Sequence, residues 1–194
     1  MGSWGITAFE SDDGLDAVGF IRRNLPVDGE LNLGKIIETL HQDKWNKPAD
    51  VTNGKPHTSP MALAEVVVKF LNKDINDLDY QESWAENDNK FSDITSFTAS
   101  SESIKWLRNY ISDTLKFATE NAEFNVQYGR KWGGWFKEKD WIAWQGHMST
   151  LISHLDTLLD THQNQVELIS AYEQQSECTK NESPNNGITT LFGI

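Results

Sequence analysis

The chain of 194 residues has little cysteine and no long apolar run. Its single cysteine, Cys178, cannot form an internal disulfide bond, so the fold does not depend on an oxidising compartment and we expect a cytoplasmic location. The first residues lack the basic and apolar segments of a secretory signal. The longest apolar stretch, residues 61–71, is interrupted by Glu65 and Lys69 and falls well short of the roughly 20 residues that span a bilayer.

Basic residues are also scarce. The chain has 17 Lys and Arg against 29 Asp and Glu, which gives a formal net charge of −12. Nucleic acids are bound mainly through Lys and Arg, so we do not expect a general DNA- or RNA-binding function. Anionic membranes are unfavourable partners for the same reason. The charge favours association with a basic protein instead.

Familiar patterns of catalysis and cofactor binding are missing. The sequence has no P-loop, no dinucleotide-binding glycine pattern, no nucleophile elbow and no HExxH motif. Cys178 lies close to Glu177 in a polar segment, which is a poor setting for a thiolate nucleophile. His147 and His154 share a helical face, but that face borders an apolar stripe. We therefore expect neither a metal site nor a cofactor, and no particular reaction is indicated.

Helical periodicity, by contrast, runs along much of the chain. One apolar stripe follows the capping residue Ser11 and ends at Pro26. One further long stripe starts near Ser101, and another extends from about 140 to 162. Short helices are expected at 33–41 and 165–174.

One helix should occupy the centre of the domain. Ser59 and Pro60 mark its start, because Ser can cap free amides and Pro suits the first helical position. Its apolar residues cover more than half of its circumference and leave a narrow polar wedge at Glu65 and Lys69.

These patterns predict an all-α domain of four to five helices, packed orthogonally or as a bundle, over residues 1–172. A long loop at 26–59 follows the first helix and looks like an insertion. Residues 74–93 are expected to form an acidic connector. Residues 173–194 are polar and turn-prone, so we expect a flexible tail.

Two sets of residues are candidates for binding. The first is the segment 130–139, which has four basic residues and three aromatic ones in an otherwise acidic chain. Within it, Arg130, Trp132 and Trp135 are the candidate binding residues, because Arg and Trp are enriched at binding hot spots and tryptophan faces can stack on a sugar. The alternative is structural: the tryptophans cover the end of the bundle.

The second set lies at the N-terminus. Asp12, Asp13 and Asp16 occupy the first turns of the expected helix, where carboxylates cap or pair. Trp4 is expected to hold the preceding segment against the bundle. The alternative is a surface ligand site built from Trp4 and these three carboxylates.

The N-terminus also carries a motif, composed of Met1-Gly2-Ser3-Trp4-Gly5, Phe9, Ser11-Asp12-Asp13 and Leu15-Asp16. This motif resembles the start of a bacterial family catalogued as domain of unknown function 4259. Ser11 replaces the family's usual Asn, and Gly14 stands near a position that the family usually fills with a better helix former. The resemblance implies a bacterial, cytoplasmic, mainly helical domain and transfers no catalytic role.

The leading prediction is a non-enzymatic acidic domain that binds another protein, as an immunity or antitoxin protein blocks a basic toxin. One alternative is an enzyme of unrecognised type with a cleft lined by Asp12, Asp13, Asp16 and the tryptophans between 132 and 144. Another is sugar binding by exposed tryptophans.

Overall fold

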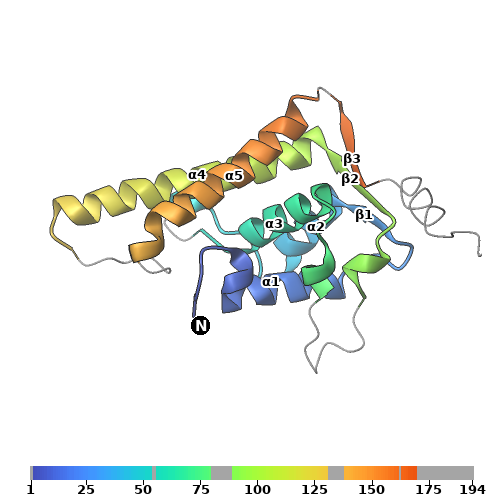
Figure 1. Cartoon of the computed structure of the whole chain (residues 1–194), viewed down its shortest axis with the longest axis horizontal. Coiled ribbons are helices and arrows are strands. Elements are labelled where there is room, and N and C mark those ends of the chain that lie inside the picture. The colour runs from blue at the N-terminus through green and yellow to red at the C-terminus, as the bar shows by residue number, and fades with distance from the viewer. Residues whose placement is uncertain (1, 54–55, 80–88, 131–137, 162, 170–194) are drawn as a thin grey trace, which may run out of the picture.

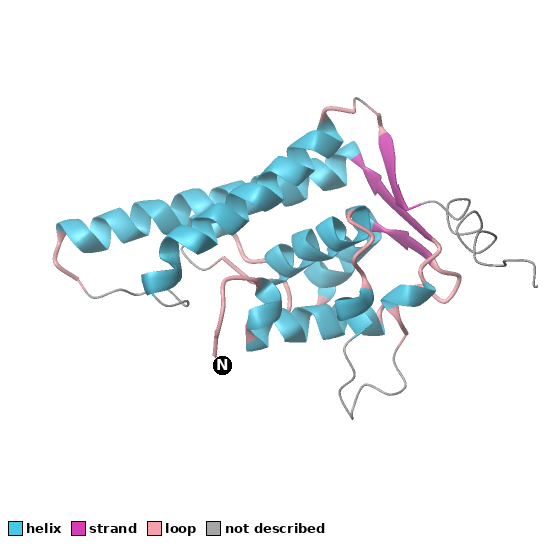
Figure 2. Cartoon of the chain, in the orientation of Figure 1, coloured by secondary structure: helices cyan, strands magenta, loops and turns pink. Residues whose placement is uncertain are grey.

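The computed structural model describes residues 2–53, 56–79, 89–130, 138–161 and 163–169. Within these ranges the chain forms five α-helices and one three-stranded sheet (Figure 2). The helices are α1 (Asp12–Arg23), α2 (Leu33–Gln42), α3 (Ser59–Leu71), α4 (Ser101–Gln127) and α5 (Trp141–Leu159). The strands are β1 (Glu30–Asn32), β2 (Ser96–Ser100) and β3 (Gln165–Ile169), and a short 3-10 turn, η1 (Ala8–Glu10), precedes α1.

The helices are stacked in layers around α3. Helices α4 and α5 run antiparallel as a long hairpin on one side of α3, while α1 packs on the other side (Figure 1). Every residue from Ser59 to Val67 is therefore buried. The prediction of a central, fully covered helix is confirmed.

The start of α3 differs in one detail from the prediction. Pro60 lies in the first turn as expected, but Ser59 does not cap the helix. Ser59 is the first helical residue, and its hydroxyl donates to the Asn46 carbonyl over 2.7 Å. Its role is therefore to connect the preceding loop to α3.

The prediction of a purely all-α fold is wrong, although the chain is mostly helical. Strand β2 lies in the middle of a sheet that closes one end of the helical layers, parallel to β1 and antiparallel to β3 (Figure 1). Residues 165–169 form β3 instead of the expected helix. Val166 and Leu168 are buried while Gln165 and Glu167 are exposed, which is the alternation of a strand with one covered face.

The segment 26–59 is an integral part of the core and not a surface insertion. It supplies β1 and the expected short helix, α2. Its buried apolar side chains are Leu31, Leu33, Ile36, Ile37, Leu40 and Val51. They bury apolar surface that an inserted loop would leave in water.

Two predicted segments lie partly or wholly outside the described residues. These are the acidic connector, of which 80–88 is not described, and the C-terminal tail at 173–194. In the part of the chain that the structure covers, no helix is long and apolar enough to cross a membrane.

Candidate functional site

The N-terminal arm, residues 2–11, folds back onto the start of α1. The Gly2 amide donates to the Asp12 carboxylate over 2.6 Å, and the Asp12 amide donates to the Gly2 carbonyl over 3.0 Å. Further along, the Trp4 amide donates to the Glu10 carbonyl over 2.9 Å. These hydrogen bonds close the arm into a compact loop.

Two glycines allow the close approaches within this loop. A Cβ atom on Gly5 would lie 2.0 Å from the carboxyl carbon of Glu10. A Cβ atom on Gly14 would lie 1.8 Å from the backbone oxygen of Ala8, which cannot move without the arm. Gly14 is therefore explained by the crossing of η1 over α1, which outweighs its poor helix propensity.

Glu65 of α3 connects the arm to two helices. Its side chain is buried, with 5% exposed, and Oε1 accepts the Ala8 N–H over 2.8 Å, while Oε2 accepts the Phe9 N–H over 3.4 Å. Nε2 of His147, on α5, lies 2.6 Å from the same Oε1. Since a carboxylate only accepts hydrogen bonds, this geometry makes His147 the donor. One buried carboxylate thus joins η1, α3 and α5.

Glu10 is held in a similar way by its own chain. Its carboxylate accepts the N–H groups of Ile6 over 2.9 Å and Thr7 over 3.1 Å, and the Thr7 hydroxyl over 3.1 Å. The hydrogen bond from the Thr7 backbone is the main cause that lowers the pKa of Glu10, and the nearby His147 adds to it. Glu10 is therefore a carboxylate at neutral pH and a weak base.

An open groove of about 750 Å³, here called the arm groove, lies between the arm, α3 and α5. Its lining residues are Ile6, Thr7, Phe9, Glu10, Leu15, Glu65, Val68, Lys69, His147 and Leu151. A mainly apolar wall with a few polar groups at this volume is typical of a binding site. Lys69 borders the groove with its ammonium 5.6 Å from the centre of the Phe9 ring and 3.7 Å from the Asp74 carboxylate.

The two carboxylates of the arm groove are poorly suited to act as acid–base groups themselves. Proton transfer needs a group whose pKa lies near the working pH. The Glu10 carboxylate has a lowered pKa and accepts three hydrogen bonds, and the Glu65 carboxylate is engaged by two amides and an imidazole. These groups fix the arm on α3 and α5.

The predicted N-terminal site residues do not line the arm groove. Trp4 is 54% exposed, and Asp12 is engaged with the Gly2 amide. Asp13 is half-buried and its charge acts on His57, while Asp16 is exposed. The three aspartates thus have separate surroundings along the first turns of α1.

Of the second predicted set, only Arg130 lies within the described residues; Trp132 and Trp135 do not. The Arg130 guanidinium lies 4.9 Å from the centre of the Phe124 ring, near the C-terminal end of α4. This contact is a cation–π interaction on an exposed surface.

Sequence reasoning missed the pairing of Glu65 with His147. It placed Glu65 in a polar wedge and His147 beside an apolar stripe, but the two residues are 82 positions apart. The available signal was a carboxylate on a helix that is otherwise apolar on nearly every face, because such a group needs a partner when it is buried. Across the described ranges, no three His, Cys, Asp or Glu side chains are grouped so that they could hold a metal ion.

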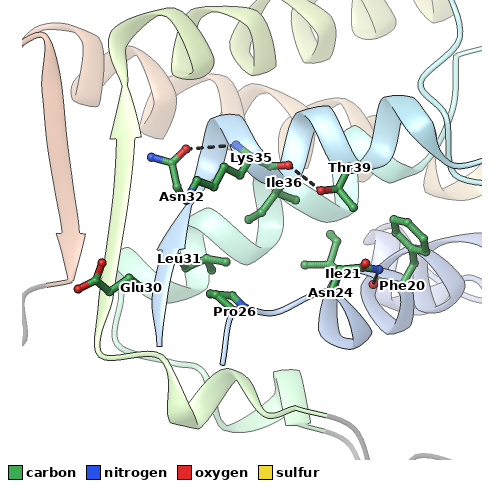
Figure 3. A pocket seen from close by; sticks show the side chains of 10 residues that line it. All are labelled: Phe20, Ile21, Asn24, Pro26, Glu30, Leu31, Asn32, Lys35, Ile36 and Thr39. Carbon is green, nitrogen blue, oxygen red and sulfur yellow. Dashed lines mark hydrogen bonds between the residues drawn. The ribbon is translucent and has the colours of Figure 1, made fainter. Parts of the chain in front are cut away.

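A smaller cavity of about 180 Å³ lies between the end of α1, β1 and α2 (Figure 3). Two of its polar residues serve α2 itself: the Asn32 side chain accepts the Lys35 amide over 3.1 Å, and the Thr39 hydroxyl donates to the Lys35 carbonyl over 2.8 Å (Figure 3). The cavity is also below the usual size of a small-molecule site.

Comparison with protein-family models, curated proteins and solved structures finds no match to this chain. The resemblance of the N-terminal motif to domain of unknown function 4259 therefore stays a prediction.

Proposed function

We propose that this protein is a non-enzymatic acidic domain that binds a basic protein partner, in the manner of an immunity or antitoxin protein. The observation that carries the proposal is the net charge of −12, from 29 acidic and 17 basic residues. Such a charge speeds association with a cationic partner and disfavours nucleic acids and anionic membranes. The same proposal assigns the protein to the cytoplasm.

The state of the arm groove supports this proposal. Its two carboxylates and its imidazole are used to hold the arm, so they are engaged before any ligand arrives. Meanwhile carboxylates such as Asp16, Asp113 and Glu123 lie exposed on α1 and α4, where a partner can reach them. The acidic surface is thus available for recognition, while the buried acids serve the fold.

The test is capture of a partner from an extract of the source organism at two salt concentrations. We expect a basic protein to be retained at about 0.1 M salt and largely released at about 1 M, because the Debye length falls from about 10 Å to about 3 Å. Binding of the purified partner should also slow as salt rises. Recovery of no partner, or of one indifferent to salt, would count against the proposal.

We also propose that the chain is related to the bacterial family catalogued as domain of unknown function 4259. In support, residues of the motif meet in one structural unit: Gly2 binds Asp12, and Ser3 forms an antiparallel bridge with Ser11, which caps α1. Residues that build one loop together give a shared motif a structural basis. A second member with the same hydrogen bonds in this loop is the test; a differently folded N-terminus would contradict the relation.

One observation favours a second candidate, an enzyme. His147 and Glu65 lie 2.6 Å apart at the wall of a 750 Å³ groove, and a carboxylate that orients an imidazole is an arrangement used in general acid–base catalysis. This pair differs from the aspartate- and tryptophan-lined cleft expected from the sequence. A substrate panel with wild type and His147→Gln separates the two functions. Wild-type activity that is lost in His147→Gln, with partner binding intact, supports the enzyme. Partner binding by wild type with no activity on any substrate of the panel supports the binding domain.

A further inference from the structure

A second cleft, here called the α4 cleft, lies between residues 47–52 and the first half of α4 and has a volume of about 440 Å³. Its wall on α4 is aromatic. Trp106 and Tyr110 are one helical turn apart with ring centres 5.6 Å apart, and His41 of α2 contacts Trp106 edge-on at 5.4 Å. The cleft thus offers an aromatic surface that none of the roles described above uses.

The aromatic wall is fixed in place before any ligand binds. The Tyr110 hydroxyl donates to the Ala49 carbonyl over 2.9 Å and accepts the His57 amide over 2.9 Å. Burial raises the pKa of Tyr110, so the phenol keeps its proton at neutral pH. The loop is therefore tied to α4, and binding requires little rearrangement.

The charged groups of the cleft are mainly acidic. Asp50 and Asp113 are both exposed, and Lys47 is the cation at the rim. The Thr52 hydroxyl and amide donate to Asp50 over 2.6 and 2.9 Å, and these bonds lower its pKa. Asp113 lies three residues beyond Tyr110, on the same side of α4. Two carboxylates therefore flank the aromatic wall.

We propose that the α4 cleft receives an arginine side chain of the basic partner; this inference rests on the proposed function. A guanidinium is attracted to the face of an aromatic ring, and because it is planar it can stack flat on that face. It can also donate two parallel hydrogen bonds to a carboxylate such as Asp113. A neutral sugar could stack on Trp106 and donate its hydroxyl groups to the carboxylates, but it carries no positive charge to pair with them.

The test uses a matched pair of small probes. Nα-acetyl-arginine methylamide carries the guanidinium, and the citrulline analogue replaces it with a neutral urea of nearly the same shape. Both are titrated into the full chain while the indole N–H of Trp106 is followed by NMR, with cellobiose as the sugar probe. We expect saturable shifts with the arginine probe at millimolar concentrations, and at least roughly tenfold weaker binding of the other two.

Two variants separate local from general charge effects. Asp113→Asn should weaken binding of the arginine probe roughly two- to fivefold, as expected for an exposed ion pair. Glu123→Gln removes one charge on the same helix, about 15 Å further along, and should leave the binding unchanged. Equal binding of the arginine and citrulline probes, tighter binding of cellobiose, or equal behaviour of the two variants would each overturn the inference.

The failure of this inference can be told apart from failure of the proposed function. Capture of a salt-sensitive basic partner that binds Asp113→Asn and Glu123→Gln equally would overturn only the inference about the α4 cleft. Selective binding of the arginine probe without any salt-sensitive partner would support the cleft and overturn only the proposed function.

Discussion

Replacing Glu65 with leucine tests whether this buried carboxylate holds the N-terminal arm. The change removes the acceptor of the Ala8 and Phe9 amides and of His147. A buried donor without an acceptor costs about 1–3 kcal/mol. The Ala8 amide and the His147 imidazole each lose a close acceptor, whereas the 3.4 Å contact from Phe9 is weak. We therefore expect Glu65→Leu to lower the free energy of unfolding by about 2–4 kcal/mol.

Two matched variants bracket that value. Glu65→Gln keeps one carbonyl acceptor for the Ala8 amide and should cost only about 1–2 kcal/mol. Glu38→Gln changes an exposed carboxylate on α2 and should stay within about 0.5 kcal/mol of wild type. The double variant Glu65→Leu/His147→Leu should recover part of the loss, because the imidazole no longer lacks its acceptor.

Urea unfolding followed by circular dichroism measures these differences, and amide hydrogen exchange at Ala8 reports on the arm directly. Exchange at Ala8 should accelerate in Glu65→Leu and remain slow in Glu38→Gln. If Glu65→Leu unfolds at the same urea concentration as Glu38→Gln, the carboxylate does not hold the arm and the reasoning about the arm groove fails.

Three further predictions concern the same region and its surroundings. Gly14→Ala should lower the free energy of unfolding by about 1–3 kcal/mol, seen in thermal melting, because a Cβ meets the Ala8 oxygen; a gain of about 1 kcal/mol from helix propensity would contradict this. Burial lowers the pKa of His57 from 6.5, and its Nδ1 accepts the Ser59 amide. The stabilising contribution of His57 is therefore complete above about pH 6.5 and is lost as the pH falls through the lowered pKa. In His57→Asn, the free energy of unfolding measured from about pH 7 to 5 should lack this dependence on pH. The pKa of Glu10 is lowered from 4.5, so its contribution to stability is present above about pH 4.5 and is lost on further acidification. Below about pH 4.5, the free energy of unfolding of Glu10→Gln should therefore depend less on pH than that of wild type, and an equal dependence would contradict this role of Glu10.

The helices could be predicted because their causes are local. Ser11 and Pro26 bound the first helix within a few residues of α1, and the apolar stripes of α3, α4 and α5 recur at helical spacing. The strands could not be predicted in the same way. Strand β1 has three residues and pairs with β2 some 66 positions away, so neither segment carries enough periodicity to reveal the sheet.

The arm groove was predictable only in part. The sequence indicates a polar wedge at Glu65 and Lys69, and the structure places both residues at the groove. That His147 meets Glu65 depends on how α5 packs on α3, which sequence spacing does not specify. The role of Gly14 depends likewise on a backbone crossing with Ala8 and not on a local preference.

The burial of most of α3 beneath its neighbours affects how the chain folds during synthesis. On the ribosome, α3 emerges long before α4 and α5, whose side chains cover it. At roughly 5–20 residues per second, this apolar segment stays uncovered for several seconds. We therefore expect the nascent protein to be a client of chaperones that bind exposed hydrophobic stretches, and release from them to follow the synthesis of α5.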